Sequence, residues 1–155
     1  MSDDVLSVIP DDPRWQPSKD AAARAHALVA SWFPENPEGF EPYVETTWYD
    51  AVNAVDCGEN LDRIGCPVCG GEIDLQWWCD LGEAHAESGF TDLGVTVPCC
   101  GAALSLDTLR FEAPCGFSRF EIAVWNPERD AFGGGELAAL ADALGHPVRQ
   151  IRAHI

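Results

Sequence analysis

Two short cysteine-containing stretches are the part of this sequence whose residue types and spacing suggest chemistry. Residues 66–71 read Cys-Pro-Val-Cys-Gly-Gly, and residues 98–101 read Pro-Cys-Cys-Gly. Cysteines three positions apart and followed by glycine are typical of a tight turn that directs two sulfurs to one metal, because glycine readily adopts positive φ. Four thiolates around a tetrahedral Zn²⁺ form a closed, structural site. The sequence therefore predicts one structural zinc ion, bound by Cys66, Cys69, Cys99 and Cys100.

The second stretch departs from the usual spacing, which leaves the set of ligands open. Adjacent side chains on an extended strand point to opposite faces, so Cys99 and Cys100 reach one ion only if the chain turns between them. Pro98 and Gly101 favour such a turn. The spacer from Cys69 to Cys99 holds 29 residues, more than the usual ~15–20. A helix inserted between the two turns would account for the extra length.

Other residues are alternative ligands if one of the four cysteines does not reach the metal: Cys57, His85 and Cys115. Each also has an ordinary structural role, the two cysteines as small buried residues and the histidine as a packed side chain beside Trp78. Cys79 lies on the side of the helix predicted over residues 74–87 that is opposite its expected buried face. We expect its thiol to point away from the core and to bind no metal.

Thiol chemistry without a metal is the competing interpretation. A Cys-X-X-Cys pair in a redox enzyme opens a helix whose dipole lowers the pKa of one thiol, and Gly70-Gly71 is a poor helix start. A nucleophilic pairing of Cys115 with His146 or His154 is the other option. The sequence contains no phosphate-binding loop, nucleophile elbow or metalloprotease His-Glu motif. A thiol- or zinc-dependent enzyme therefore stays an alternative to a protein without catalytic activity.

The charge of the chain is strongly one-sided. Nine Lys and Arg residues face 26 Asp and Glu residues, a net charge of −17, and the first 116 residues hold 21 of the acidic and five of the basic residues. Such a field repels nucleic-acid phosphates. It favours a protein partner with a basic surface, although solubility alone would also explain it. A nucleic-acid-binding zinc ribbon is the alternative, and it would need a basic groove formed by Arg110, Arg119, Arg149 and Arg152.

The N-terminus and the hydropathy pattern bear on location. The chain begins Met-Ser-Asp-Asp, whereas a secretory signal begins with basic residues and an apolar run. No stretch approaches the ~18 consecutive apolar residues of a membrane span. We therefore predict a cytoplasmic protein without membrane association, whose seven cysteines are reduced or bound to metal.

The elements that must position the cysteines repeat one pattern at the two ends of the chain. Strand, helix and strand are predicted over 4–9, 18–33 and 42–56, and again over 117–125, 137–144 and 148–155. Two such units can form one sheet with helices on one face, as in ferredoxin-like folds. We predict an α+β fold in a single domain, residues 1–155, with residues 57–116 as a zinc-ribbon-like insertion. Gly133-Gly134-Gly135 is predicted to be a flexible hinge.

The predicted insertion has elements of its own. Asp74 is placed to cap a helix that reaches Glu87, and Trp77, Leu81 and Ala84 share its expected buried face. Residues 90–97 alternate loosely and are predicted to enter the second cysteine turn as a strand.

The cysteine turns resemble those of zinc ribbons. The stretch from Cys66 through Pro98-Cys99-Cys100-Gly101, on to Gly116–Phe120 and the final Ala153-His154-Ile155, also resembles a family of uncharacterised bacterial proteins, over about the last 90 residues. This resemblance implies no particular activity. The residues themselves favour a small acidic zinc-binding protein that acts by protein–protein interaction, as an adaptor, a regulator or an immunity-type protein.

Overall fold

The computed structural model of this chain describes residues 3–34, 42–55, 61–113 and 115–155. Its largest element is a four-stranded antiparallel sheet with strand order β2-β8-β1-β9. The strands are β1 (Asp4–Pro10), β2 (Tyr43–Val55), β8 (Gly116–Trp125) and β9 (Val148–His154). Helix α1 (Lys19–Trp32) connects β1 to β2, and α3 (Gly134–Leu144) connects β8 to β9. Each strand of one strand–helix–strand unit therefore lies beside a strand of the other unit.

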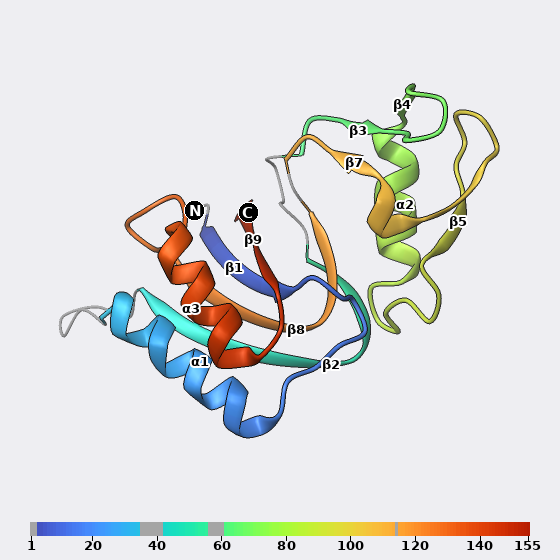
Figure 1. Cartoon of the computed structure of the whole chain (residues 1–155). Coiled ribbons are helices and arrows are strands. Elements are labelled where there is room, and N and C mark those ends of the chain that lie inside the picture. The colour runs from blue at the N-terminus through green and yellow to red at the C-terminus, as the bar shows by residue number, and fades with distance from the viewer. Residues whose placement is uncertain (1–2, 35–41, 56–60, 114) are drawn as a thin grey trace.

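The cysteine region lies between β2 and β8 in the chain and forms smaller elements. Sheet β4-β3-β7 and the pair β5-β6 are separate from the large sheet. Their bounds are β3 (Ile64–Gly65), β4 (Glu72–Ile73), β5 (Gly94–Thr96), β6 (Ala103–Ser105) and β7 (Arg110–Phe111), with helix α2 (Leu75–Ala84) and a 3-10 turn, η1 (Leu106–Thr108). Figure 1 shows this region at one side of the large sheet. The predicted α+β class is confirmed.

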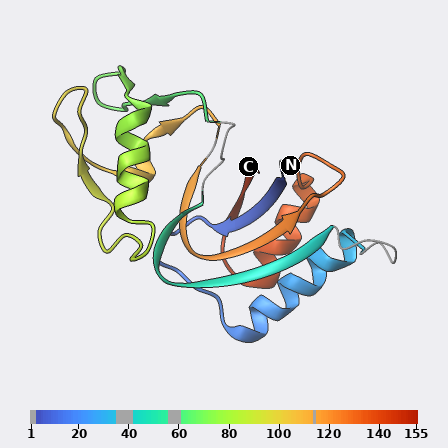
Figure 2. The ribbon, with the colours of Figure 1, turned by 180° about the vertical axis from the view of Figure 1, so that it is seen from behind.

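The main core lies between the large sheet and the two long helices, which cover the same face of the sheet (Figures 1 and 2). Strand residues with period two supply one side of this core, because alternate side chains share a face. The helices supply the other side through their apolar stripes. The buried members are Leu6 and Val8 of β1, Phe120, Ile122 and Val124 of β8, Ala22, Ala25 and Val29 of α1, Leu140 and Leu144 of α3, and Phe33 and Phe132 outside these elements.

Helix α1 starts where the sequence predicts. The Ser18 hydroxyl accepts a hydrogen bond from the Ala21 N–H at 3.1 Å and so caps the first turn. The buried residues of this helix include Ala21, Ala25 and Val29, while Leu28 and Trp32 are half-buried.

The three glycines at the start of α3 do not form the predicted flexible hinge. Gly134 and Gly135 are the first residues of the helix. The Glu136 side chain accepts a hydrogen bond from the Gly133 N–H at 2.8 Å, which caps the helix start. Arg129 donates to Glu136 at 2.6 Å, and this hydrogen bond lowers the pKa of the Glu136 carboxyl. Side-chain capping therefore compensates for the low helix propensity of the glycines.

An irregularity in β2 connects the large sheet to the cysteine region. The pairing register with β8 shifts between Trp48 and Asn53, within the stretch that is predicted as one strand over 42–56. Beyond it, Val52 pairs with Phe90, whose N–H donates to the Val52 carbonyl at 2.7 Å. A strand of the large sheet thus holds the chain that follows α2.

Aromatic side chains complete this junction. Phe117 of β8 meets Trp78 of α2 and Phe90 edge-on, with ring centroids 5.9 Å and 5.6 Å apart. Trp78 is buried, whereas Trp77, predicted to lie on the buried face, is half-buried. The helix phase expected from the sequence was therefore wrong by about one position. The local pattern does not contain the cause, because Phe117, which packs against Trp78, is distant in the sequence. The helix also ends at Ala84 instead of Glu87, and only Gly94–Thr96 of the predicted strand 90–97 pairs as β5.

Gly89 offers a test of this junction. Its φ is +71°, and a Cβ there would lie 2.8 Å from the Val52 carbonyl oxygen. We expect Gly89→Ala to lower the free energy of unfolding by about 2–3 kcal/mol, because both the backbone conformation and the close approach oppose a side chain. Urea denaturation followed by circular dichroism measures this. Gly82→Ala is the matched control: Gly82 lies in α2 with nothing near its Cβ position, so alanine should stabilise by up to about 1 kcal/mol. Equal stability of the Gly89 variant and the wild type would contradict the close packing.

Candidate metal centre

The first cysteine turn is the tip of the β3–β4 hairpin. The Cys66 N–H donates to the Gly71 carbonyl at 2.9 Å, and the Gly70 N–H donates back to the Cys66 carbonyl at 3.0 Å. Gly70 has φ of +71°, which explains the need for glycine after the second cysteine. The Gly71 N–H also donates to the Cys69 sulfur at 3.3 Å. The turn thus fixes two sulfurs and directs a backbone dipole at one of them.

The second cysteine turn has the same backbone and is the tip of the β5–β6 hairpin. The Val97 N–H donates to the Ala102 carbonyl at 3.0 Å, and the Gly101 N–H donates to the Val97 carbonyl at 2.9 Å. Gly101 has φ of +73°. Val97 therefore occupies the position that Cys66 has in the first turn, and Cys100 the position of Cys69.

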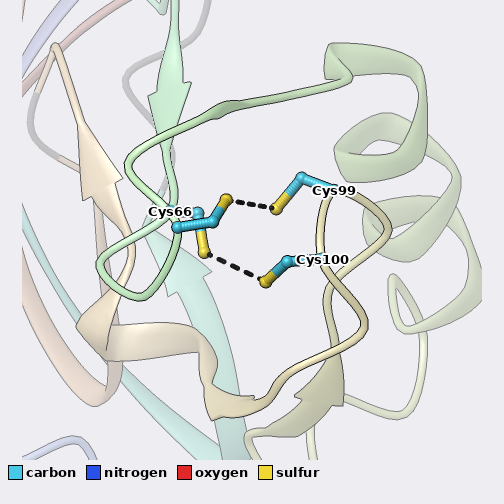
Figure 3. Close-up of side chains that lie close together, drawn as sticks. Cys66, Cys99 and Cys100 are labelled. Atoms are coloured by element: carbon cyan, nitrogen blue, oxygen red, sulfur yellow. Dashed lines mark hydrogen bonds between the residues drawn. The ribbon is translucent and has the colours of Figure 1, made fainter.

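The two hairpin tips bring the four predicted cysteines together. All four Sγ atoms lie within 4.8 Å of one another. The Cys66 and Cys100 sulfurs are 3.9 Å apart, and those of Cys69 and Cys99 are 3.5 Å apart. Four sulfurs at about 2.3 Å from a tetrahedral zinc would be separated by about 3.8 Å. Figure 3 shows Cys99 and Cys100 approaching Cys66 from the opposite turn. This arrangement can hold one metal ion.

Cys99 reaches the cluster from an unusual position. It corresponds to Val68 of the first turn, a residue whose side chain is 61% exposed. Val97, at the usual position of a ligand, is instead fully buried in the core of this region, as is Cys66. The chain turns over residues 98–100, so the adjacent Cys99 and Cys100 do not lie on opposite faces of a strand. The sequence does indicate that the two turns are equivalent, since Pro and Gly occupy matching positions in both. A search for a second Cys-X-X-Cys motif overlooks this equivalence.

The surroundings of the thiols differ in their effect on ionisation. The backbone N–H groups of Cys69 and Val68 lower the pKa of Cys66 to about 7. Loss of hydration, together with the neighbouring Cys69 and Cys66 thiols, raises the pKa of Cys99 to about 12. The Ala102 N–H lowers the pKa of Cys100, but desolvation and the thiols of Cys66 and Cys69 outweigh it, so that this pKa is also raised. A bound cation would have to displace protons from such thiols, as is usual for thiolate ligands.

The alternative ligands lie elsewhere or outside the described residues. His85 stacks on Phe90 with ring centroids 4.5 Å apart and contacts the Gly89 carbonyl through Nδ1 at 3.2 Å. Cys115 is buried in an apolar cluster with Ile9, Val55 and Ile151. Cys57 lies outside the residues that the structure describes.

Residues considered for other chemistry have separate surroundings. Cys79 is exposed on α2, as expected. His146 stacks on Trp15 with centroids 4.3 Å apart, and His154 contacts Asp4 at 3.0 Å. Of the arginines in the hypothetical basic groove, Arg152 pairs with Asp130 at 3.2 Å.

Comparison with protein-family models, curated proteins and solved structures finds no match for this chain. The resemblance to a bacterial family and the ferredoxin-like description of the sheet therefore stay predictions. None of the helices in the described part of the chain is both long and apolar enough to cross a membrane.

The equivalence of the two turns can be tested by moving one ligand. Cys99→Ser should weaken Zn²⁺ binding by more than the ~10–100-fold that loss of a residue supporting a ligand costs. Adding Val97→Cys should recover most of the affinity, because position 97 matches Cys66. Competition with a chromophoric chelator measures both constants. The matched control is Val97→Ala with Cys99→Ser, which opens the same position without a thiol. If the double variant with Val97→Cys binds zinc no better than this control, the two turns are not equivalent.

Proposed function

We propose that the four clustered cysteines bind one structural zinc ion, and that the protein acts by binding another protein through its acidic surface. In this proposal, residues 57–116 are a zinc-ribbon-like insertion within a single domain. The observation that supports the metal is the approach of four sulfurs to within 4.8 Å of one another. A cytoplasmic location would keep these thiols reduced and available.

The donor set favours zinc in a structural role. Sulfur ligands in a tetrahedral arrangement suit zinc or iron–sulfur chemistry, and a single ion among four cysteines suits zinc. Four thiolates leave no open coordination position for substrate or water, whereas catalytic zinc keeps one. A catalytic role is therefore the less supported alternative.

The local structure also explains why a metal would be needed. β3 and β4 contain two residues each, and β5 and β6 three, whereas isolated hairpins are marginal even when longer. The two hairpins share an apolar core that includes Ile64, Ile73 and Val97, and their cysteine turns meet at the tips. A zinc ion between them would contribute stability on the scale of about 10–16 kcal/mol seen in small zinc-binding peptides, which is comparable with the stability of a whole domain.

Metal analysis tests the first half of the proposal. Protein purified without added metal should contain about one zinc per chain. Cys66→Ser and Cys69→Ser should each lose zinc and unfold at lower denaturant concentration. Cys79→Ser is the matched control, since Cys79 is exposed on α2 and outside the cluster. Absence of zinc from folded protein, with all seven thiols reacting freely with a thiol reagent, would contradict the site.

The second half of the proposal depends on charge. Residues 61–113 hold nine Asp and Glu residues against two Arg, a net charge of −7, and all nine acidic residues are exposed. Zn²⁺ with four thiolates would add two further negative charges. A surface of this kind accelerates the approach of a basic protein and slows that of nucleic acid. An adaptor, a regulator or an immunity-type protein would each use such a surface.

Salt dependence tests the second half. A partner is first isolated by affinity purification from the cells that make the protein, and its association rate is then measured by stopped flow. We expect the rate to fall between ~0.1 M and ~1 M salt, because the Debye length shortens from about 10 Å to about 3 Å. An association rate that is insensitive to salt would indicate that the acidic surface serves only the solubility of the protein. A shift of duplex or single-stranded DNA at ~0.15 M salt would instead favour a nucleic-acid ligand.

A further inference from the structure

The face of the large sheet opposite α1 and α3 carries a groove that the zinc site does not use. Its volume is about 390 Å³. The strand alternation that sends Leu6 and Val8 toward the helices places Val5 and Ser7 on this other face. An apolar cluster of Ile9, Val55, Cys115 and Ile151, packed by residues from both ends of the cysteine region, closes one end of the face.

Glu121 lies in this groove with its carboxylate held in place. The Tyr49 hydroxyl donates to Oε1 at 2.7 Å, and the Ser7 hydroxyl donates to Oε2 at 2.5 Å. Ser7 is only 3% exposed. Burial and the adjacent Glu121 raise the pKa of Tyr49, so its hydroxyl stays protonated and continues to donate.

The Glu121 carboxylate still has capacity for a ligand. An ionised carboxylate offers about four acceptor positions, of which the two hydroxyls occupy two. None of the ion pairs among the described residues includes Glu121. Arg119, two residues earlier on β8, donates instead to the Asp50 carbonyl at 3.1 Å.

An aromatic ring, Trp125, and a second carboxylate, Glu45, line the same groove as Glu121. The Trp125 indole N–H donates to Glu45 at 3.1 Å, which fixes both side chains in the groove. Trp125 in turn stacks on Tyr43, with ring centroids 6.0 Å apart and planes only 6° from parallel. Tyr43 is 36% exposed and is the first residue of β2.

The charge of the groove selects for a cation. Glu45 and Glu121 are among its described lining residues, and Lys and Arg are not. A guanidinium fits this combination better than an ammonium, because its planar donors can pair with a carboxylate while its face stacks on an aromatic ring. Charge complementarity therefore names the occupant as an arginine side chain.

We infer that this groove binds an arginine presented by an extended basic segment of the protein partner. The inference rests on the proposed function and specifies where the partner makes its most selective contact. The dispersed acidic residues would steer the partner, whereas Glu121 would recognise one side chain.

The test uses the full-length protein and a defined probe, the peptide acetyl-Gly-Gly-Arg-Gly-Gly-amide. Citrulline in place of arginine gives the control peptide, which has nearly the same shape without the charge. Nuclear magnetic resonance of the Trp125 indole N–H, identified with Trp125→Phe, reports on the groove and detects binding as weak as about 1 mM. We expect the arginine peptide to shift this signal and to bind at least ~10-fold more tightly than the citrulline peptide.

Variants separate the groove from the general acidity. Glu121→Gln should weaken binding of the arginine peptide at least ~10-fold. The glutamine amide can still accept a hydrogen bond from Tyr49 and donate one to Ser7, which preserves the fold. Glu128→Gln removes the same charge at an exposed position in the turn after β8 and should change binding less than ~2-fold. Glu45→Gln gives a second measurement within the groove and should also weaken binding.

Several outcomes would overturn the inference. Equal affinity of the Glu121 and Glu128 variants, equal binding of the two peptides, or an unmoved Trp125 signal would each do so. The isolated partner distinguishes this failure from failure of the proposed function. Salt-dependent association that Glu121→Gln leaves unchanged would keep the function and exclude the groove. Selective arginine binding with salt-insensitive partner association would keep the groove and exclude electrostatic steering.

Discussion

The close approach of four sulfur atoms is the constraint on which this structure most depends. Within 4.8 Å of one another, four thiolates could not remain ionised without a cation, since each charge opposes the next. The thiols also differ in their environments, since backbone hydrogen bonds lower the pKa of Cys66 whereas burial raises the pKa of Cys99. The short hairpins on either side contribute little pairing of their own, so the tips are where a bound ion would add most stability.

The two turns have matching backbones, but the same position supplies a sulfur in the first turn and an apolar core side chain in the second. Cys66 and Val97 are both fully buried at the same place in their turns, but only the first contributes a sulfur. Val97 adds to the apolar core that also contains Phe117 and Val52 of the large sheet. Cys99 then supplies the missing sulfur from the exposed side of the turn. The apolar core therefore joins the cysteine region to the large sheet, and the four sulfurs lie together where the two hairpin tips meet.

Sequence patterns predicted the features that depend on neighbouring residues. The start of α1 at Ser18, the strand from Tyr43 to Val55 and the cysteine turns all have local causes. The prediction that failed for α2 depended on a distant residue, since Trp78 is the buried side chain of this helix because Phe117 lies opposite it. The prediction that failed for the glycines at the start of α3 overlooked a nearby cap, since Arg129 and Gly133 both bind the Glu136 side chain. The groove around Glu121 was not predictable, since it needs the register of three strands that are far apart in the chain.

Charge has two different physical roles in this molecule, and each belongs to a different set of residues. The exposed carboxylates of residues 61–113 act together at long range and are screened by salt. Glu121 is fixed by Tyr49 and Ser7 in a partly enclosed groove, where screening is weaker and geometry decides which cation fits. The same apolar contacts of Ile9, Val55 and Cys115 that close one end of this groove also join it to the cysteine region. Leu61 and Phe111 pack against both this cluster and the buried core that contains Cys66, so apolar packing connects the groove to the region of the metal centre.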